Sequence, residues 1–146
     1  MVARLFDNKI WTQTSHSKRK GEEAIEGINH FDRLTWLNWM KEVSKFKYAV
    51  HLMPTHAAGT FALNCAYWGI PCIGYRGLDT QEELHPHCTV SDGNLEHARE
   101  IVKRLVNYSD FYEQCSKEAR EKYKECFSEE VYIYNMNKVI EGVLSK

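Results

Sequence analysis

The amino-acid sequence predicts an α/β fold in which a parallel sheet is flanked by helices. Two short runs, YAVHLM (48–53) and CIGY (72–75), have the nearly continuous apolar character of strands that are buried on both faces. The segment between them predicts a helix over residues 59–68, so strand, helix and strand follow one another as in a βαβ unit. From about residue 94 the pattern is helical, which predicts a helical C-terminal tail.

The composition is that of one globular domain. The chain has 146 residues, of which 43% are hydrophobic and 27% are charged, and its formal net charge of -1 gives no electrostatic sign of a nucleic-acid partner. No apolar run approaches the roughly 20 residues that cross a bilayer. Five cysteines without a CxxC pair favour reduced thiols over a disulfide framework. We therefore expect a single cytoplasmic domain over residues 1–146 without a transmembrane segment.

The N-terminal part of the chain has a less regular pattern. It predicts a strand over residues 1–6, a polar loop over 7–20, a short helix over 21–27 and a strand over 28–31. Thr35 is a favourable N-cap for a helix over residues 36–46, because its hydroxyl can accept a hydrogen bond from the first turn. The apolar stripe of this helix consists of Trp36, Trp39, Met40 and Val43.

Beyond residue 75 the sequence predicts one more helix and one more strand before the helical tail. Thr80 and Glu83 have the spacing of a capping box for a short helix over residues 81–84. The run CTV (88–90) then predicts a third strand. Strands separated by helices give the architecture of a Rossmann-like domain, although one with few strands.

Three longer helices are predicted in the tail, over about residues 94–107, 110–126 and 129–144. Asp110 and Glu113 have the spacing that caps the start of the second. The third is apolar around much of its circumference, which indicates a surface for a missing partner or, alternatively, a fully buried terminal helix. The apolar face of the first consists of Leu95, Ala98, Ile101, Val102, Leu105 and Val106.

The turn HAAGT, between the first βαβ strand and its helix, has the composition of an anion site. Ligands of parallel α/β sheets bind beyond the carboxyl ends of the strands, where free N–H groups of helix N-termini favour phosphate. Ala57, Ala58 and Gly59 leave the backbone accessible to a phosphate group, and Thr60 adds a hydroxyl. His56 can donate a hydrogen bond to a phosphate oxygen. The same local pattern is equally compatible with a tight strand-to-helix turn.

Several spacings around this turn agree with one another. Gly69 and Pro71 form a G-x-P element directly before the strand CIGY, His56 stands eight residues before Asn64, and Gln81 stands twelve after Gly69. These features resemble the donor-binding half of GT-B glycosyltransferases, in a branch whose motif runs from a His to a Glu eight residues on and closes on a Gln. With the closing helices, the resemblance covers about the last three quarters of the chain.

The resemblance implies a role for each matched position. The donor diphosphate would be held by His56, Ala58, Gly59 and Thr60. The sugar and ribose would be contacted by Gln81, Asp79 and Asn64, and the nucleotide base would lie near Trp36. Asn64 stands where the family has a Glu that grips the ribose hydroxyls, so it lacks the charge that strengthens those bonds. The donor is a substrate, and the resemblance implies neither a cofactor nor a metal, while the catalytic residue stays unassigned.

GT-B enzymes consist of two Rossmann-like domains with the active site between them. The resemblance therefore implies that this chain is the C-terminal, nucleotide-sugar-binding domain of a hexosyltransferase-like enzyme and is inactive by itself. The acceptor-binding N-terminal domain would come from elsewhere in the same protein or from a partner chain. A sugar-nucleotide epimerase of the same fold and a non-catalytic interaction module remain as alternatives. HPHC (85–88) gives a weaker indication of zinc, because structural zinc normally has four ligands in recognisable pairs.

Overall fold

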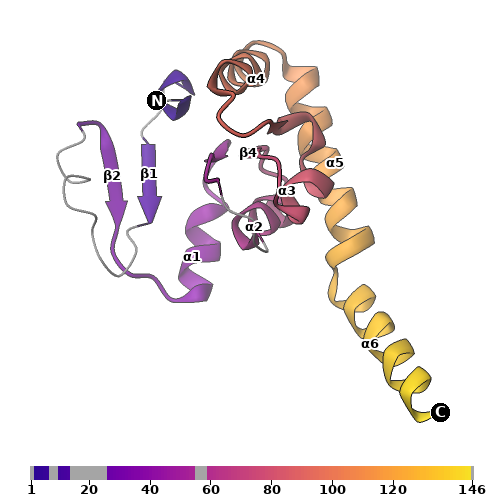
Figure 1. Ribbon diagram of the computed structural model, residues 1–146. Coiled ribbons are helices and arrows are strands. Elements are labelled where there is room, and N and C mark those ends of the chain that lie inside the picture. The colour runs from indigo at the N-terminus through magenta and orange to yellow at the C-terminus, as the bar shows by residue number, and fades with distance from the viewer. Residues whose placement is uncertain (1, 7–9, 14–25, 55–58, 146) are drawn as a thin grey trace.

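The computed structural model describes residues 2–6, 10–13, 26–54 and 59–145 and shows an α/β protein (Figure 1). Its strands form two parallel sheets, one of β1 and β2 and one with the strand order β3-β4-β5. Parallel sheets flanked by helices are the predicted arrangement and are consistent with a Rossmann-like domain of few strands. The strands are Ile10–Gln13 (β1), Ile28–Phe31 (β2), Ala49–His51 (β3), Cys72–Tyr75 (β4) and Thr89–Val90 (β5).

Helices connect and cover the strands. The helix predicted over 59–68 and the three predicted in the tail are confirmed to within about one residue at each end. The α-helices of the described part are Trp36–Val43 (α1), Thr60–Trp68 (α2), Asp79–Leu84 (α3), Leu95–Asn107 (α4), Ser109–Phe127 (α5) and Glu129–Leu144 (α6). Two short 3-10 helices are Val2–Phe6 (η1) and Pro86–Cys88 (η3).

Helices lie on both faces of the sheet because its central strand, β4, buries side chains on both faces. All four of its residues are buried, as predicted for CIGY. Successive side chains of a strand point to opposite faces. Ile73 and Tyr75 accordingly join a core that η1 and α4 close, whereas Cys72 packs in a second core with Cys65 of α2.

The strand predicted over 48–53 is shorter than expected and only half-buried. It spans Ala49–His51 and pairs with β4 on one side, with Ala49 opposite Cys72. Val50 and Ala49 pack against the two different cores, but all three residues of β3 are only partly buried, so the full burial predicted for this strand is wrong. The short strand predicted at 88–90 is confirmed as β5, although Cys88 belongs to η3.

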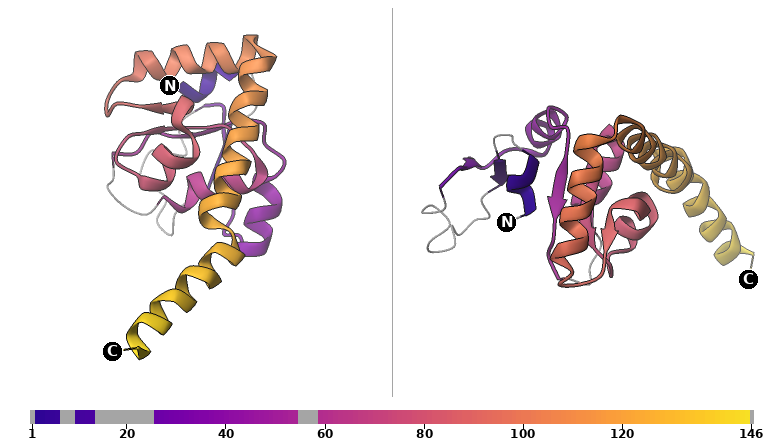
Figure 2. Two further views of the ribbon diagram at one scale, coloured as in Figure 1. Left: turned by 90° about the vertical axis from the view of Figure 1, so that its right-hand side faces the viewer. Right: turned by 90° about the horizontal axis from the view of Figure 1, so that it is seen from above.

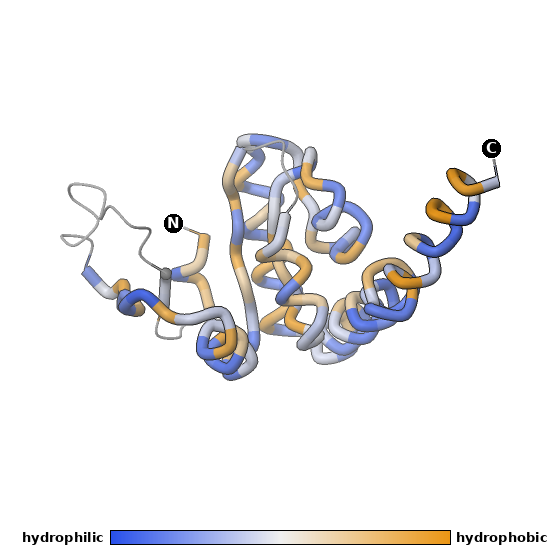
Figure 3. Tube along the Cα trace, turned by 90° about the horizontal axis from the view of Figure 1, so that it is seen from below, coloured by the Kyte–Doolittle hydropathy of each residue, from blue (hydrophilic) through white to orange (hydrophobic). Residues whose placement is uncertain are grey.

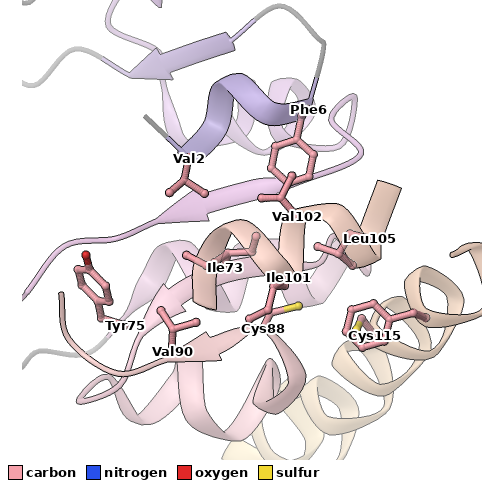
Figure 4. Packing of buried hydrophobic residues seen from close by; sticks show 12 residues of the cluster. Val2, Phe6, Ile73, Tyr75, Cys88, Val90, Ile101, Val102, Leu105 and Cys115 are labelled. Atoms are coloured by element: carbon pink, nitrogen blue, oxygen red, sulfur yellow. The ribbon is translucent and has the colours of Figure 1, made fainter. Parts of the chain in front are cut away.

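The larger core lies between the sheet and α4 (Figure 4). Val2 and Phe6 of η1 enter it. Residues 2–6 form this 3-10 helix instead of the strand that the sequence predicts. The face predicted for α4 is confirmed at Ala98, Ile101, Val102 and Leu105, whereas Leu95 and Val106, near its two ends, are exposed.

The N-terminal residues also depart from the prediction. β1 lies within the segment predicted as a loop over 7–20, because Ile10, Trp11 and Thr12 are branched or aromatic and suit a strand. Trp11 stacks on Phe31 of β2, with the ring centroids 4.6 Å apart. The strand predicted at 28–31 is confirmed as β2. The rest of that loop and residues 21–25 of the predicted helix lie outside the described residues.

Caps were predicted correctly at α1 and wrongly at α3 and α5. The Thr35 hydroxyl accepts from the Asn38 N–H at 3.4 Å, although α1 ends at Val43 rather than at residue 46. Thr80 lies inside α3 instead of before it, and its hydroxyl donates to Gly59 O at the N-cap of α2. Asp110 lies in the first turn of α5. Its carboxylate interacts favourably with the helix dipole there but does not cap the helix.

The terminal helix α6 leaves the body of the molecule (Figure 2). None of its residues is buried among the described part of the chain, so it is not the fully buried terminal helix that the sequence also allowed. Figure 3 shows hydrophobic positions along α6 interspersed with hydrophilic ones. The large apolar side chains exposed on this helix are Tyr132, Ile133, Tyr134, Met136, Val139, Ile140, Val143 and Leu144. Among the helices of the described residues, none combines the length and apolar character needed to span a membrane.

Helix α2 ends in a Schellman motif at Gly69. The Gly69 N–H donates to Ala66 O at 2.9 Å and the Ile70 N–H donates to Cys65 O at 2.8 Å. Gly69 has φ 69°, in the left-handed region that glycine adopts without a steric penalty. The Arg120 guanidinium of α5 lies directly over this glycine and donates to Trp68 O at 3.2 and 3.3 Å. The turn therefore joins α2 to both β4 and α5.

We expect Gly69→Ala to destabilise the fold by about 1–2 kcal/mol, because an alanine at positive φ is strained. Its methyl group would also displace the Arg120 side chain. Urea unfolding followed by circular dichroism measures the change. Gly142→Ala in α6 is the matched control, since a methyl group there meets no described atom within 4 Å. A Gly69→Ala protein as stable as the wild type would contradict this description of the turn.

Candidate functional site

The carboxyl ends of β3, β4 and β5 lie at one edge of the parallel sheet. The chain continues from these ends into α2, α3 and α4 respectively (Figure 1). Ligands of parallel α/β sheets bind at this edge. The first N–H groups of each following helix have no intrahelical partner and are therefore potential donors there.

Of these helix starts, those of α2 and α3 have no side-chain cap among the described residues, and we call the first the open start of α2. No described side chain caps α2, whose first residue Thr60 is exposed. At α4, by contrast, the Asn94 side chain accepts from the His97 N–H at 3.0 Å. In the loop before α3, the Gly77 N–H already donates to Glu82 Oε1 at 2.8 Å. The start of α2, the longer of the two uncapped helices, is therefore the candidate position for an anion at this edge.

Gly59 is required at the start of α2 by its surroundings. A Cβ at this position would lie 2.5 Å from Thr80 Oγ1 and 3.4 Å from Leu78 Cδ1. The Thr80 hydroxyl donates to Gly59 O at 2.8 Å, and both residues are buried. This bond fixes the first turn of α3 against the start of α2. It brings together Gly59, Thr60 and Asp79, three of the positions that the sequence assigns to a donor site.

The other predicted site residues have different placements. His56 and Ala58 lie outside the described residues. Asp79 is exposed as the first residue of α3, whereas Asn64 is buried on α2 with 6% of its surface accessible. Trp36 is 60% exposed at the start of α1, and the ring contact that joins α1 to α2 is made by Trp39 instead.

Gln81 lies in the interior rather than at the surface. Its Nε2 donates to Cys72 O at 2.9 Å and to Thr89 Oγ1 at 3.2 Å, so it links α3 to β4 and β5. Its side chain also packs against the Cα of Gly74, where a Cβ would collide with it. A sugar at the surface does not meet this fully buried amide in the observed conformation.

His51 is a polar residue at this edge that the sequence analysis does not single out. It ends β3, and its ring centroid lies 5.4 Å from that of Phe61 on α2. Its Nδ1 is buried and has no hydrogen-bond partner among the described residues, and burial lowers the pKa of the ring. The signal in the sequence is a histidine inside an otherwise apolar strand.

The HPHC segment does not form a ligand cluster in the described structure. His85 is buried and its Nε2 lies 3.0 Å from Ala62 O, whereas the exposed His87 pairs with Glu118 at 3.0 Å. Cys88 belongs to the core. No group of three or more candidate metal ligands is found among the described residues.

Comparison of the chain with protein-family models, with curated proteins and with solved structures finds no match. The functional interpretation therefore depends on the site itself.

Burial lowers the pKa of His85 from 6.5 to about 4, although its hydrogen bond to Ala62 O acts to raise the pKa. The unfolded chain binds a proton at this histidine below about pH 6.5, while the folded chain binds it only near pH 4. Its contribution to stability is therefore complete above pH 6.5 and falls as the pH falls to about 4. The difference in the pKa of His85 between the unfolded and the folded state corresponds to about 3 kcal/mol in the free energy of unfolding.

We expect His85→Gln to remove this part of the pH dependence, because glutamine can donate to Ala62 O but does not titrate. Urea unfolding between pH 7.5 and pH 4 measures the slope for the wild type and the variant. His97→Gln, at an exposed position of α4, should keep the wild-type slope. An unchanged slope in His85→Gln would show that His85 is not held neutral in the fold.

Proposed function

We propose that this chain is the donor-binding domain of a glycosyltransferase of the GT-B fold, and that it binds a nucleotide-diphosphate sugar. The observation that supports this proposal most directly is the open start of α2 at the carboxyl edge of the sheet. Gly59 is buried against Thr80, so the exposed Thr60 is the described residue of this turn that a phosphate can reach. Oriented N–H groups and a helix dipole favour such an anion.

The described residues suggest how a donor would be oriented. The N–H groups of Thr60 and Phe61 would donate to the diphosphate, and the Thr60 hydroxyl would add a further donor. Asp79 is exposed beside Thr80 and would accept from sugar hydroxyl groups. Gln81 is better assigned to the scaffold, because its amide is already bonded to β4 and β5.

A domain of this kind needs a second domain to carry the acceptor. The exposed apolar residues of α6 support that part of the proposal, since an apolar helix face normally packs against another surface. The same residues also favour a second candidate, a non-catalytic interaction module of this fold. The buried Asn64 in place of a ribose-binding Glu points in the same direction. Binding of a nucleotide-sugar distinguishes the two candidates.

The test is saturation-transfer NMR of the chain with UDP-, GDP- and ADP-glucose, followed by titration of the nucleotide-sugar that binds. Thr60→Pro removes the first N–H donor of α2 and still suits a helix, because proline is favoured at that position. We expect it to weaken binding about tenfold, as for one hydrogen bond to a charged group. Thr60→Val is the matched control for the hydroxyl, since it keeps the N–H. His56→Ala tests the remaining predicted phosphate donor.

A Thr60→Pro protein that folds and binds as tightly as the wild type would contradict the assignment to α2. Absence of transfer from all three nucleotide-sugars, at millimolar concentration, would instead favour the interaction module.

A further inference from the structure

A cavity of about 850 Å³ lies among η1, β1, α1, β3 and the beginning of α2. Its volume is in the range of small-molecule pockets. It is distinct from the open start of α2, although Phe61 forms part of its wall. The main aromatic side chains of the wall are Phe6, Trp11, Phe31, Trp39, Phe46 and Phe61.

The aromatic rings of the wall hold one another in place. Phe31 contacts Trp11 with centroids 4.6 Å apart, Trp39 at 6.3 Å and Phe46 at 6.1 Å. Trp39 in turn contacts Phe61 at 6.2 Å. Such a wall is preformed, so an apolar ligand would lose little free energy to reorganisation of the site.

Among the described residues, the charged side chains that line the cavity are all cations. They are Lys45, Lys47 and Arg99, and no carboxylate of the described residues belongs to the lining. Glu42 pairs with Lys45 at 2.6 Å and Glu96 pairs with Arg99 at 3.1 Å.

Lys47 differs from the other two cations. Its Nζ lies over the rings of Tyr48 and Tyr112, at 5.4 and 4.9 Å from their centroids. Among the described residues no carboxylate forms an ion pair with it. The cavity thus combines an apolar interior with an exposed lysine in its wall that forms no ion pair among the described residues.

We propose that this cavity binds an amphiphile with a single long apolar chain and an anionic head group. The chain lies along the aromatic wall, and a carboxylate or phosphate head group pairs with Lys47. A carboxylate and a phosphate each accept charge-assisted hydrogen bonds from an ammonium group. The inference does not depend on glycosyl transfer, because none of the residues assigned above to the nucleotide-sugar donates to this ligand.

Calorimetric titration with dodecanoate and with dodecyl phosphate, each below its micelle concentration, tests the proposal. We expect saturable binding of one molecule per chain, and the stronger ligand identifies the head group. Lys47→Glu should weaken binding at least tenfold. Lys103→Glu, at an exposed lysine of α4 outside the cavity, should change it less than twofold.

A second pair of variants tests the wall. Trp11→Ala should weaken binding, whereas Trp36→Ala, at an exposed tryptophan that does not line the cavity, should leave it unchanged. Dodecyltrimethylammonium, with the opposite charge, should bind at least tenfold more weakly than either anion. Non-saturable binding, equal affinity for this cation, or equal losses in the two lysine variants would overturn the proposal.

Discussion

The buried amide of Gln81 is the interaction on which the arrangement of the candidate site depends. It donates to a backbone carbonyl of β4 and to the Thr89 hydroxyl of β5, and it lies against Gly74 where no side chain fits. Loss of the Nε2 partners would leave a buried donor unsatisfied at a cost of about 1–3 kcal/mol, so these two bonds hold α3 against the sheet. With α3 fixed, the preceding residue Thr80 reaches Gly59 O and sets the start of α2.

The site contains two sets of residues: buried residues that hold its backbone in place, and exposed residues that can contact a ligand. Gln81 and Thr80 are buried and bonded to the scaffold, whereas Thr60 and Asp79 are exposed at the carboxyl edge of the sheet. The glycosyltransferase proposal needs only the exposed set to contact the donor. The buried set keeps the backbone donors of α2 oriented before a ligand arrives, which lowers the free-energy cost of binding.

Local patterns in the sequence predict most elements, because long amphipathic helices and the continuous apolar strand CIGY have clear periodicity. The predictions are wrong where tertiary contacts, rather than local sequence patterns, determine the position of a side chain. Thr80 was predicted to cap α3, but its hydroxyl bonds to Gly59, 21 residues away. The spacing that predicted Gln81 as a sugar ligand cannot show that its amide is turned inward. His51 was missed because a single polar residue does not alter the pattern of an apolar strand.

The central claim is that the donors at the start of α2 form an anion site. The most direct measurement is the ¹H–¹⁵N spectrum of the chain, recorded as a nucleotide-diphosphate sugar is added. The account predicts that the largest amide shifts occur at Gly59, Thr60 and Phe61, with a smaller change at Asp79. Shifts concentrated on α6 or on the aromatic cavity, with the α2 amides unmoved, would contradict it.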